Sequence, residues 1–220
     1  MKKTCIVIVG PTAVGKTSFA IRLAQSLHAE IISADSRQCF RELNIGVAKP
    51  SLEELALVPH HFISSHSIFE EVNAGAFERY ALEKLGEFFS ESDVAVVVGG
   101  TGLYIKALTS GMDAIPETPV SLREEIKQAY STFGMDWLHN ELNKYDPAYL
   151  VQQEKHNSQR LMRALEVIKH TGKSISSYQT NEVAKRDFEI MTIGLELPRP
   201  ELYARINQRV EVMMQDWLWE

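Results

Sequence analysis

The chain has 220 residues and a formal net charge of −6, from 23 basic and 29 acidic side chains. Its content of 45% apolar and 24% charged residues is ordinary for a globular protein, so disordered, collagen-like and coiled-coil classes are excluded. No apolar run reaches the length of a membrane-spanning helix, about 18 residues, and we expect no membrane association. The acidic balance by itself argues against a nucleic-acid partner, whose usual binding surface is basic.

Two cysteines, Cys5 and Cys39, provide neither a disulfide framework nor a zinc-binding spacing. This usage fits a reducing, cytoplasmic setting. Cys39 is interpreted as a small buried residue rather than a nucleophile. The length suits one domain, or one domain that carries a smaller insertion. A monomer is the default expectation.

The first half of the chain alternates strand-like and helix-like segments. Apolar runs predict strands at 5–9, 31–32 and 93–98, and apolar residues at helical spacing predict helices at 17–27 and 74–89. Strands separated by helices imply right-handed crossovers and a parallel sheet.

The pattern changes near residues 115–119 and is helical from there to about 186. The predicted helices of this part are 122–130, 135–142 and 158–170, followed by a strand at 188–197 and a helix at 201–219. We therefore expect an α/β fold. Its discontinuous core, 1–116 with 187–220, would be interrupted by a helical insertion at 117–186.

A phosphate-binding loop is the strongest motif. It matches the pattern G-x-x-x-x-G-K-[ST] and consists of Gly10, Pro11, Thr12, Ala13, Val14, Gly15, Lys16 and Thr17. The loop lies between an apolar strand and an amphipathic helix, which is the context that supports the motif. Its backbone N–H groups and the helix N-terminus attract phosphate, Lys16 adds a positive charge, and the Thr17 hydroxyl can hold Mg²⁺. The core is thus expected to be P-loop NTPase-like.

Features of nucleotide hydrolases are absent. The strand at 93–98 ends in Gly99-Gly100 rather than in an aspartate, and no Asn-Lys-x-Asp guanine-recognition motif occurs. The sequence therefore favours a transferase that uses the same phosphate-binding loop.

Asp35 follows the second predicted strand, at the edge of the sheet where ligands of parallel sheets bind. Its carboxylate could accept a proton from a nucleophile or help to hold Mg²⁺. A capping role in the next turn is an equally good interpretation of the spacing alone.

Six motifs in one order resemble the tRNA dimethylallyltransferase (tRNA isopentenyltransferase) family. They lie at 10–17, 33–38 (Ser-Ala-Asp-Ser-Arg-Gln), 45–50 (Ile-Gly-Val-Ala-Lys-Pro), 58–61 (Val-Pro-His-His), 98–104 (Val-Gly-Gly-Thr-Gly-Leu-Tyr) and 163–167 (Arg-Ala-Leu-Glu-Val). The resemblance implies transfer of a dimethylallyl group from dimethylallyl pyrophosphate to N6 of adenosine 37, beside the tRNA anticodon. The phosphate-binding loop, which bears the nucleotide-binding motif, would then hold pyrophosphate rather than ATP.

The resemblance also implies roles for particular residues. Asp35, Thr101 and Lys16 match the catalytic positions, and Mg²⁺ on Thr17 would be the cofactor. The positions that match tRNA-contacting residues are Asp35, Ser36, Arg37, Gln38, Thr101, Arg123, Gln159, Arg160, Leu161, Met162 and Arg163. The target adenine would be flipped out of the anticodon loop to reach the site.

The chain departs from the family pattern in a few places. Asn157 stands where many members have aspartate, so a carboxylate cannot be essential there. Family members normally continue for some tens of residues beyond Glu220, and we expect the chain to be C-terminally short.

The net charge is unevenly distributed along the chain. The segment 120–190 has a net charge of zero, against −4 for 1–119 and −2 for 191–220. The predicted tRNA-binding insertion is thus the least acidic part.

Two other groups of residues have competing interpretations. His60, His61 and His66 could suggest a metal site, but turn and cap roles near the substrate channel are favoured because no fourth ligand is suitably spaced. Arg199, Arg205 and Arg209 fit a solvated helix face, with a phosphate clamp by Arg199 or Arg209 as the alternative.

Three rival functions remain. A transferase that prenylates free AMP would not need the helical insertion. A small-molecule kinase would not explain the motifs at 33–38 and 98–104, and a non-catalytic nucleic-acid-binding module would not need Lys16 and Asp35.

Overall fold

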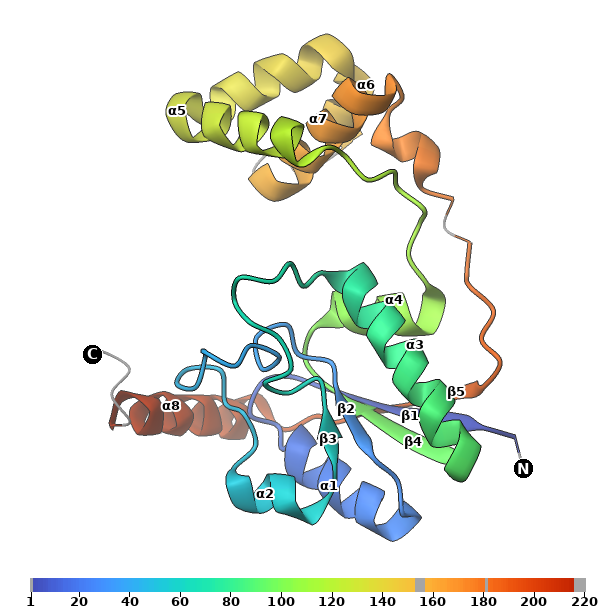
Figure 1. Ribbon diagram of the computed structural model, residues 1–220. Coiled ribbons are helices and arrows are strands. Elements are labelled where there is room, and N and C mark those ends of the chain that lie inside the picture. Colours follow the sequence, from blue (N-terminus) through green and yellow to red (C-terminus); the bar gives the residue numbers. More distant parts are fainter. Residues whose placement is uncertain (1, 153–156, 181, 216–220) are drawn as a thin grey trace. The chain divides into compact units, whose positions relative to one another are not determined.

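The computed structural model describes residues 2–152, 157–180 and 182–215. The chain divides into two compact units (Figure 1): unit 1 comprises residues 1–112 and 183–220, and unit 2 comprises residues 113–182. The sequence predicts an insertion at 117–186. No helix among the described residues is long and apolar enough to cross a membrane.

Unit 1 is an α/β fold built on a five-stranded sheet in the order β3-β2-β4-β1-β5, with every neighbouring pair parallel. The strands are β1 (Thr4–Val9), β2 (Ile31–Ser33), β3 (His60–His61), β4 (Val94–Val98) and β5 (Glu189–Gly194). The helices are α1 (Lys16–Leu27), α2 (Leu52–Leu57), α3 (Ala74–Glu91), α4 (Gly102–Ser110) and α8 (Arg199–Gln215). The expected α/β class, parallel sheet and P-loop NTPase-like core are confirmed.

Alternate side chains of the central strands enter two separate cores. Cys5 and Val7 of β1 pack with α3 and α4, whereas Ile6 and Ile8 pack with α1. This two-sided burial explains why β1 and β4 are continuous apolar runs rather than alternating ones. The edge strand β5 is different, because four of its six residues are exposed.

Unit 2 is helical. It contains α5 (Val120–Tyr145), α6 (Pro147–Gln152), α7 (Ser158–Thr171) and a 3-10 turn, η1 (Ile175–Tyr178). Its core is formed by apolar residues of all four elements. Gly134 interrupts α5 with φ 72° and ψ −163°, so the predicted pair of helices around this glycine is confirmed as two segments of one element.

The predicted strands and long helices are confirmed within a few residues of their ends, and residues 216–219 of the predicted last helix lie outside the described part of the chain. The apolar pattern of the sequence does not predict α2, β3, α4, α6 and η1. These elements have two to nine residues, too few to establish a clear apolar period.

Candidate active site

The phosphate-binding loop joins β1 to α1. Gly15 caps α1 with φ 98°, and Ala13 also has a positive φ, of 64°. A Cβ at Gly10 would lie 2.5 Å from the carbonyl oxygen of Leu195, which follows β5, so only glycine fits there. The loop therefore has the tight backbone that turns successive N–H groups toward an anion at the helix N-terminus.

Lys16 lies at the mouth of this loop. Its Nζ donates hydrogen bonds to the carbonyl oxygens of Gly10 (2.9 Å) and Pro11 (2.8 Å). Burial lowers the pKa of the Lys16 ammonium; the carboxylate of Asp35 partly offsets this shift, and the guanidinium of Arg209 adds to it. The charges of Lys16, Asp35 and Arg209 are therefore close enough to influence one another.

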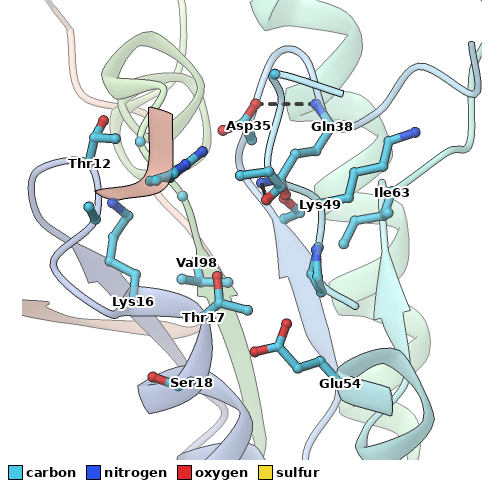
Figure 2. A pocket seen from close by; sticks show the side chains of 18 of the residues that line it. Thr12, Lys16, Thr17, Ser18, Asp35, Gln38, Lys49, Glu54, Ile63 and Val98 are labelled. Carbon is cyan, nitrogen blue, oxygen red and sulfur yellow. Dashed lines mark hydrogen bonds between the residues drawn. The ribbon is translucent and has the colours of Figure 1, made fainter. Parts of the chain in front are cut away.

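Asp35 follows β2 and is half-buried. Its Oδ1 accepts hydrogen bonds from the backbone N–H groups of Arg37 (2.9 Å) and Gln38 (3.2 Å), as Figure 2 shows for Gln38. Its other oxygen, Oδ2, makes no hydrogen bond within the described part of the chain. The capping and the chemical interpretations of Asp35 are thus compatible, because one oxygen fixes the turn and the other stays available.

Thr101 fastens the end of β4 to the turn that carries Asp35. Its Oγ1 accepts a hydrogen bond from the backbone N–H of Ser36 (3.0 Å) and lies 3.3 Å from Ser36 Oγ, and its own N–H donates to the carbonyl of Ala34 (3.2 Å). A Cβ at Gly99 would lie 2.1 Å from the same carbonyl oxygen. Gly99 therefore permits the close approach that brings Thr101 and Asp35 to one place.

Gln38 and Lys49 fix the segment 44–50, which forms another wall of the site. The Gln38 amide donates to the carbonyl of Ala48 (2.8 Å) and accepts from Ser33 Oγ (3.1 Å). Lys49 Nζ donates to the carbonyl of Phe40 (2.7 Å). The side chains of Gln38 and Lys49 thus stabilise the conformation of the segment 44–50. The side chain of Arg37, by contrast, is exposed.

These elements enclose a cavity of ≈ 570 Å³ (Figure 2). It joins Thr12, Ala13, Gly15, Lys16 and Thr17 of the loop to Ser33, Asp35, Gln38, Asn44, Ile45, Gly46, Ala48, Lys49, Pro50, Glu54, His60, Ile63, Val98, Gly99, Gly100, Arg209, Val212 and Met213. In the figure, Lys16 and Thr17 face Gln38, Lys49 and Ile63 across the open space.

Several lining residues were not expected from the sequence. Glu54 caps α2, since its carboxylate accepts from the N–H of Ser51 (3.0 Å), and Val212 and Met213 come from α8. The motif at 58–61 was a signal for His60. No local signal marks the others, because they reach the cavity only through the packing of distant segments.

His60 presents a buried ring nitrogen without a partner. Its Nδ1 lies 2.7 Å from the carbonyl of Val58 and therefore carries the proton, which leaves Nε2 as an unpaired acceptor. Burial lowers the pKa of His60, against weaker opposing effects of the Val58 bond and Glu54. His61 instead pairs with Glu30 (2.5 Å), and among the described residues no three His, Cys, Asp or Glu side chains form a group that could hold a metal ion.

The arginines of α8 separate into different environments. Arg209 lines the cavity, as the phosphate-clamp interpretation requires. Arg205 forms an ion pair with Glu201 (2.9 Å), and its guanidinium lies 3.9 Å from where a Cβ of Gly15 would be.

In unit 2, the residues of 159–163 point in different directions. Gln159 and Arg160 are exposed, whereas Leu161 and Met162 are buried in the helical core. Their two apolar side chains are therefore not available at the surface of this unit.

Arg163 and Arg123 surround the buried carboxylate of Glu166. Arg163 donates to Glu166 Oε2 (3.0 Å), to Thr118 Oγ1 (2.9 Å) and, from its second nitrogen, to the carbonyl of Pro116 (2.9 Å). Arg123 lies 3.7 Å from the same Glu166 oxygen. Arg163 thus fastens the start of the helical unit, and 31% of its side chain remains exposed.

Comparison with known proteins gives one consistent result. A family model described as IPP transferase matches residues 38–220. The chain is 46% identical over 215 residues to a tRNA dimethylallyltransferase of Cytophaga hutchinsonii, a match that covers 98% of this chain and 71% of the relative. The chain belongs to the tRNA dimethylallyltransferase family.

Solved structures of tRNA dimethylallyltransferases agree with this assignment. A full-length tRNA isopentenylpyrophosphate transferase of Bacillus halodurans is 35% identical, with a TM-score of 0.63 over 98% of this chain and 67% of that one. A eukaryotic dimethylallyltransferase acting on tRNA is 27% identical, with a TM-score of 0.79 over 97% of this chain and 53% of that one.

Proposed function

We propose that this chain transfers a dimethylallyl group from dimethylallyl pyrophosphate to N6 of adenosine 37 in tRNA and releases pyrophosphate. The observation that carries the proposal is that the phosphate-binding loop and Asp35 line the same cavity. A phosphate-binding loop alone fits many polyphosphates, whereas a carboxylate in the same cavity suits a nucleophile that must lose a proton. Membership of the family supports the choice of donor and acceptor.

The pyrophosphate of the donor binds the loop 10–17 and the N-terminus of α1. Lys16 and Arg209 both line the cavity and supply positive charge to it. Negative charge grows on the bridging oxygen as the carbon–oxygen bond breaks, and these cations stabilise it more in the transition state than in the ground state. The apolar side chains of Ile63, Val98 and Met213 limit the water that could react with the allylic carbon.

Asp35 acts on the acceptor. The lone pair of adenine N6 forms the new nitrogen–carbon bond, the electrons of the breaking carbon–oxygen bond leave with pyrophosphate, and a proton passes from N6 to Asp35 Oδ2. Because backbone N–H groups hold Oδ1, the carboxylate is fixed before the adenine arrives. Thr101, bonded to the neighbouring Ser36, positions the base beside it.

The residues present fit Mg²⁺ held largely by the substrate. A site with few protein ligands is what Mg²⁺ uses when phosphate oxygens and water complete its octahedron, and Thr17 offers a hydroxyl beside Lys16. Thr17 would hold the ion, with Asp35 in the same cavity. When bound, Mg²⁺ would neutralise charge on the pyrophosphate.

The tRNA anticodon loop is recognised by both units. In unit 1 the exposed Arg37 and the turn at Asp35 and Ser36 contact the nucleotides around the target base. In unit 2 the exposed Gln159 and Arg160 contact the backbone. The segment 120–190, which holds most of unit 2, has no net charge and therefore repels RNA less than the acidic segments on either side of it. The protein acts as a monomer in the cytoplasm, a reducing compartment in which the free, buried Cys5 and Cys39 remain thiols.

The deciding experiment offers radiolabelled dimethylallyl pyrophosphate to a tRNA carrying A36-A37-A38, with AMP and ATP as parallel acceptors. Label on the tRNA, lost when A37 is replaced by guanosine, is the expected result. Label on AMP but not on tRNA would identify the free-nucleotide transferase. Phosphate transfer from ATP without prenylation would identify a kinase, and tRNA binding without any transfer would leave a non-catalytic module.

A further inference from the structure

The chain passes between its two units twice, at residues 112–113 and 182–183, and the two crossings are paired inside unit 1. The N–H of Ala184 donates to the carbonyl of Ser110 (2.8 Å). Gly111 has φ 79°, and a Cβ there would lie 2.7 Å from the Cβ of Ala184. The outgoing and returning segments are thus in direct contact, and glycine is required for that contact.

Arg186 stabilises this pairing through two of its guanidinium nitrogens. Its Nε donates to the carbonyl of Leu108 (2.8 Å), and one terminal nitrogen donates to the carbonyl of Ala107 (2.8 Å) and to Glu78 Oε1 (2.6 Å). The carbonyls belong to the last turn of α4, and that of Ala107 also accepts a hydrogen bond from the N–H of the C-cap residue Gly111 (2.9 Å). The returning chain is therefore tied to both α3 and the end of α4.

The Arg186–Glu78 pair is largely removed from water, with 11% and 18% of the two side chains exposed. Charge-assisted hydrogen bonds are short and strong in such surroundings. The planar fork of arginine reaches three oxygens in fixed directions, which the single ammonium of lysine cannot reproduce. The pair therefore fixes a geometry as well as contributing energy.

Unit 2 contains a second link between the same two segments. Asp113 Oδ1 accepts hydrogen bonds from the N–H (3.0 Å) and the hydroxyl (3.1 Å) of Thr180. Each unit thus holds its own ends of the two crossings together. Two linkers tied together at both ends allow fewer orientations than two independent ones.

We propose that Arg186 is a positioning residue for the tRNA substrate: by fixing the paired crossings, it restricts the orientations that unit 2 can adopt before tRNA binds. This inference rests on the proposed function, in which one tRNA contacts both units. A protein that is restricted before binding loses less freedom on binding, so its affinity is higher. Pyrophosphate contacts only unit 1, so its affinity does not depend on how freely unit 2 moves.

The test uses Arg186→Lys, with Arg79→Lys as the matched control, because Arg79 is an exposed neighbour of Glu78 on α3. Gly111→Ala is the second variant, since it should separate the two crossing segments without altering a buried charge. It tests the same inference if Arg186→Lys folds poorly. Cysteines introduced at the exposed Glu83 and Ser131 carry spin labels, because both native cysteines are buried. Their distance distribution reports the freedom between the units.

Both variants should widen the distance distribution and raise the KM for tRNA roughly fivefold or more. The kcat at saturating tRNA and the Kd for pyrophosphate should stay within about twofold of the parent chain. Arg79→Lys should change none of these quantities.

A lower melting temperature without a change in KM, or a higher KM without a wider distribution, would overturn the inference, since either would leave Arg186 a structural residue only. An inactive parent chain that still binds pyrophosphate would instead overturn the proposed function. The two failures are therefore distinguishable.

Discussion

The candidate site residues of the two units behave differently. In unit 1, motifs separated by more than sixty residues of sequence meet at one cavity, whereas in unit 2 the five consecutive residues 159–163 divide between surface and core. A parallel sheet gathers the carboxyl ends of its strands at one edge, so each following loop reaches the same place. A helix turns by about 100° per residue, so a continuous motif cannot present all its side chains to one ligand.

The largest expected effect is in unit 1. Asp35→Asn keeps the hydrogen bonds to Oδ1 but removes the proton acceptor, so single-turnover prenylation of tRNA should fall about 10²–10⁴-fold. Pyrophosphate binding, measured by calorimetry, should change little. The control is Glu83→Gln, an exposed carboxylate on α3. Loss of pyrophosphate binding with an unchanged rate for bound substrate would contradict the base role.

In unit 2 the largest effect should be on stability. Leu161 is fully buried, so Leu161→Ala should lower the free energy of unfolding of this unit by about 2–5 kcal/mol through the cavity it leaves. Limited proteolysis between residues 113 and 182 reports the change. Should Leu161→Ala weaken tRNA binding with no gain in proteolysis, Leu161 would be a contact residue and the comparison would fail.

Lys16→Met tests the other end of the cavity. Removing a charge-assisted donor should weaken pyrophosphate binding about 10–100-fold. Calorimetric titration measures the change, and Lys2→Met, with a side chain that is 70% exposed, is the control. Equal affinities for both variants would show that the backbone of the loop suffices.

Arg160, the exposed residue before Leu161, should affect tRNA binding but not stability, which is the opposite of what we expect for Leu161. Arg160→Ala should leave the melting temperature unchanged and should lower the slope of log affinity for tRNA against log salt by about 0.7–0.9. Filter binding at several salt concentrations gives this slope. A destabilised protein with an unaltered slope would place Arg160 with the core residues.

The smallest expected effect is a pH dependence from His60. Burial lowers its pKa in the folded protein below the ordinary value of 6.5, so the unfolded chain binds a proton first as the pH falls. Stability from this group is complete above pH 6.5 and decreases as the pH falls through that value. Chemical denaturation at pH 7 and pH 6 should show a smaller difference for His60→Gln than for the parent chain. An equal difference would assign the pH dependence to other groups.

The phosphate-binding loop and its flanking elements could be predicted from the sequence, because they depend only on residues that are close together in the chain. The glycines of the loop 10–17, the apolar strand before it and the amphipathic helix after it lie within thirty residues, and the structure has all three as expected. The roles assigned to the site residues stay predictions. For Asp35 the sequence left two interpretations, and the hydrogen bonds at Oδ1 show how both fit one side chain.

Side-chain direction could not be predicted in the same way. Gln38 and Arg163 belong to polar motifs, yet each turns toward the protein and donates a hydrogen bond to a carbonyl oxygen of another segment, Gln38 to Ala48 and Arg163 to Pro116. Such partners are needed because a buried polar group without a hydrogen bond is costly, and a single sequence does not show which segment will supply them.

The sequence by itself determined the α/β class, the phosphate-binding loop and the order of the motifs, because these depend on apolar periodicity and on glycine at fixed spacing. Only the tertiary structure decided that Arg209 and Glu54 reach the cavity and that Leu161 does not reach the surface of its unit. It also decided that Arg186 joins two crossings whose residues are far apart in the chain. These contacts depend on close packing between distant segments, which follows from the whole fold rather than from any one stretch of it.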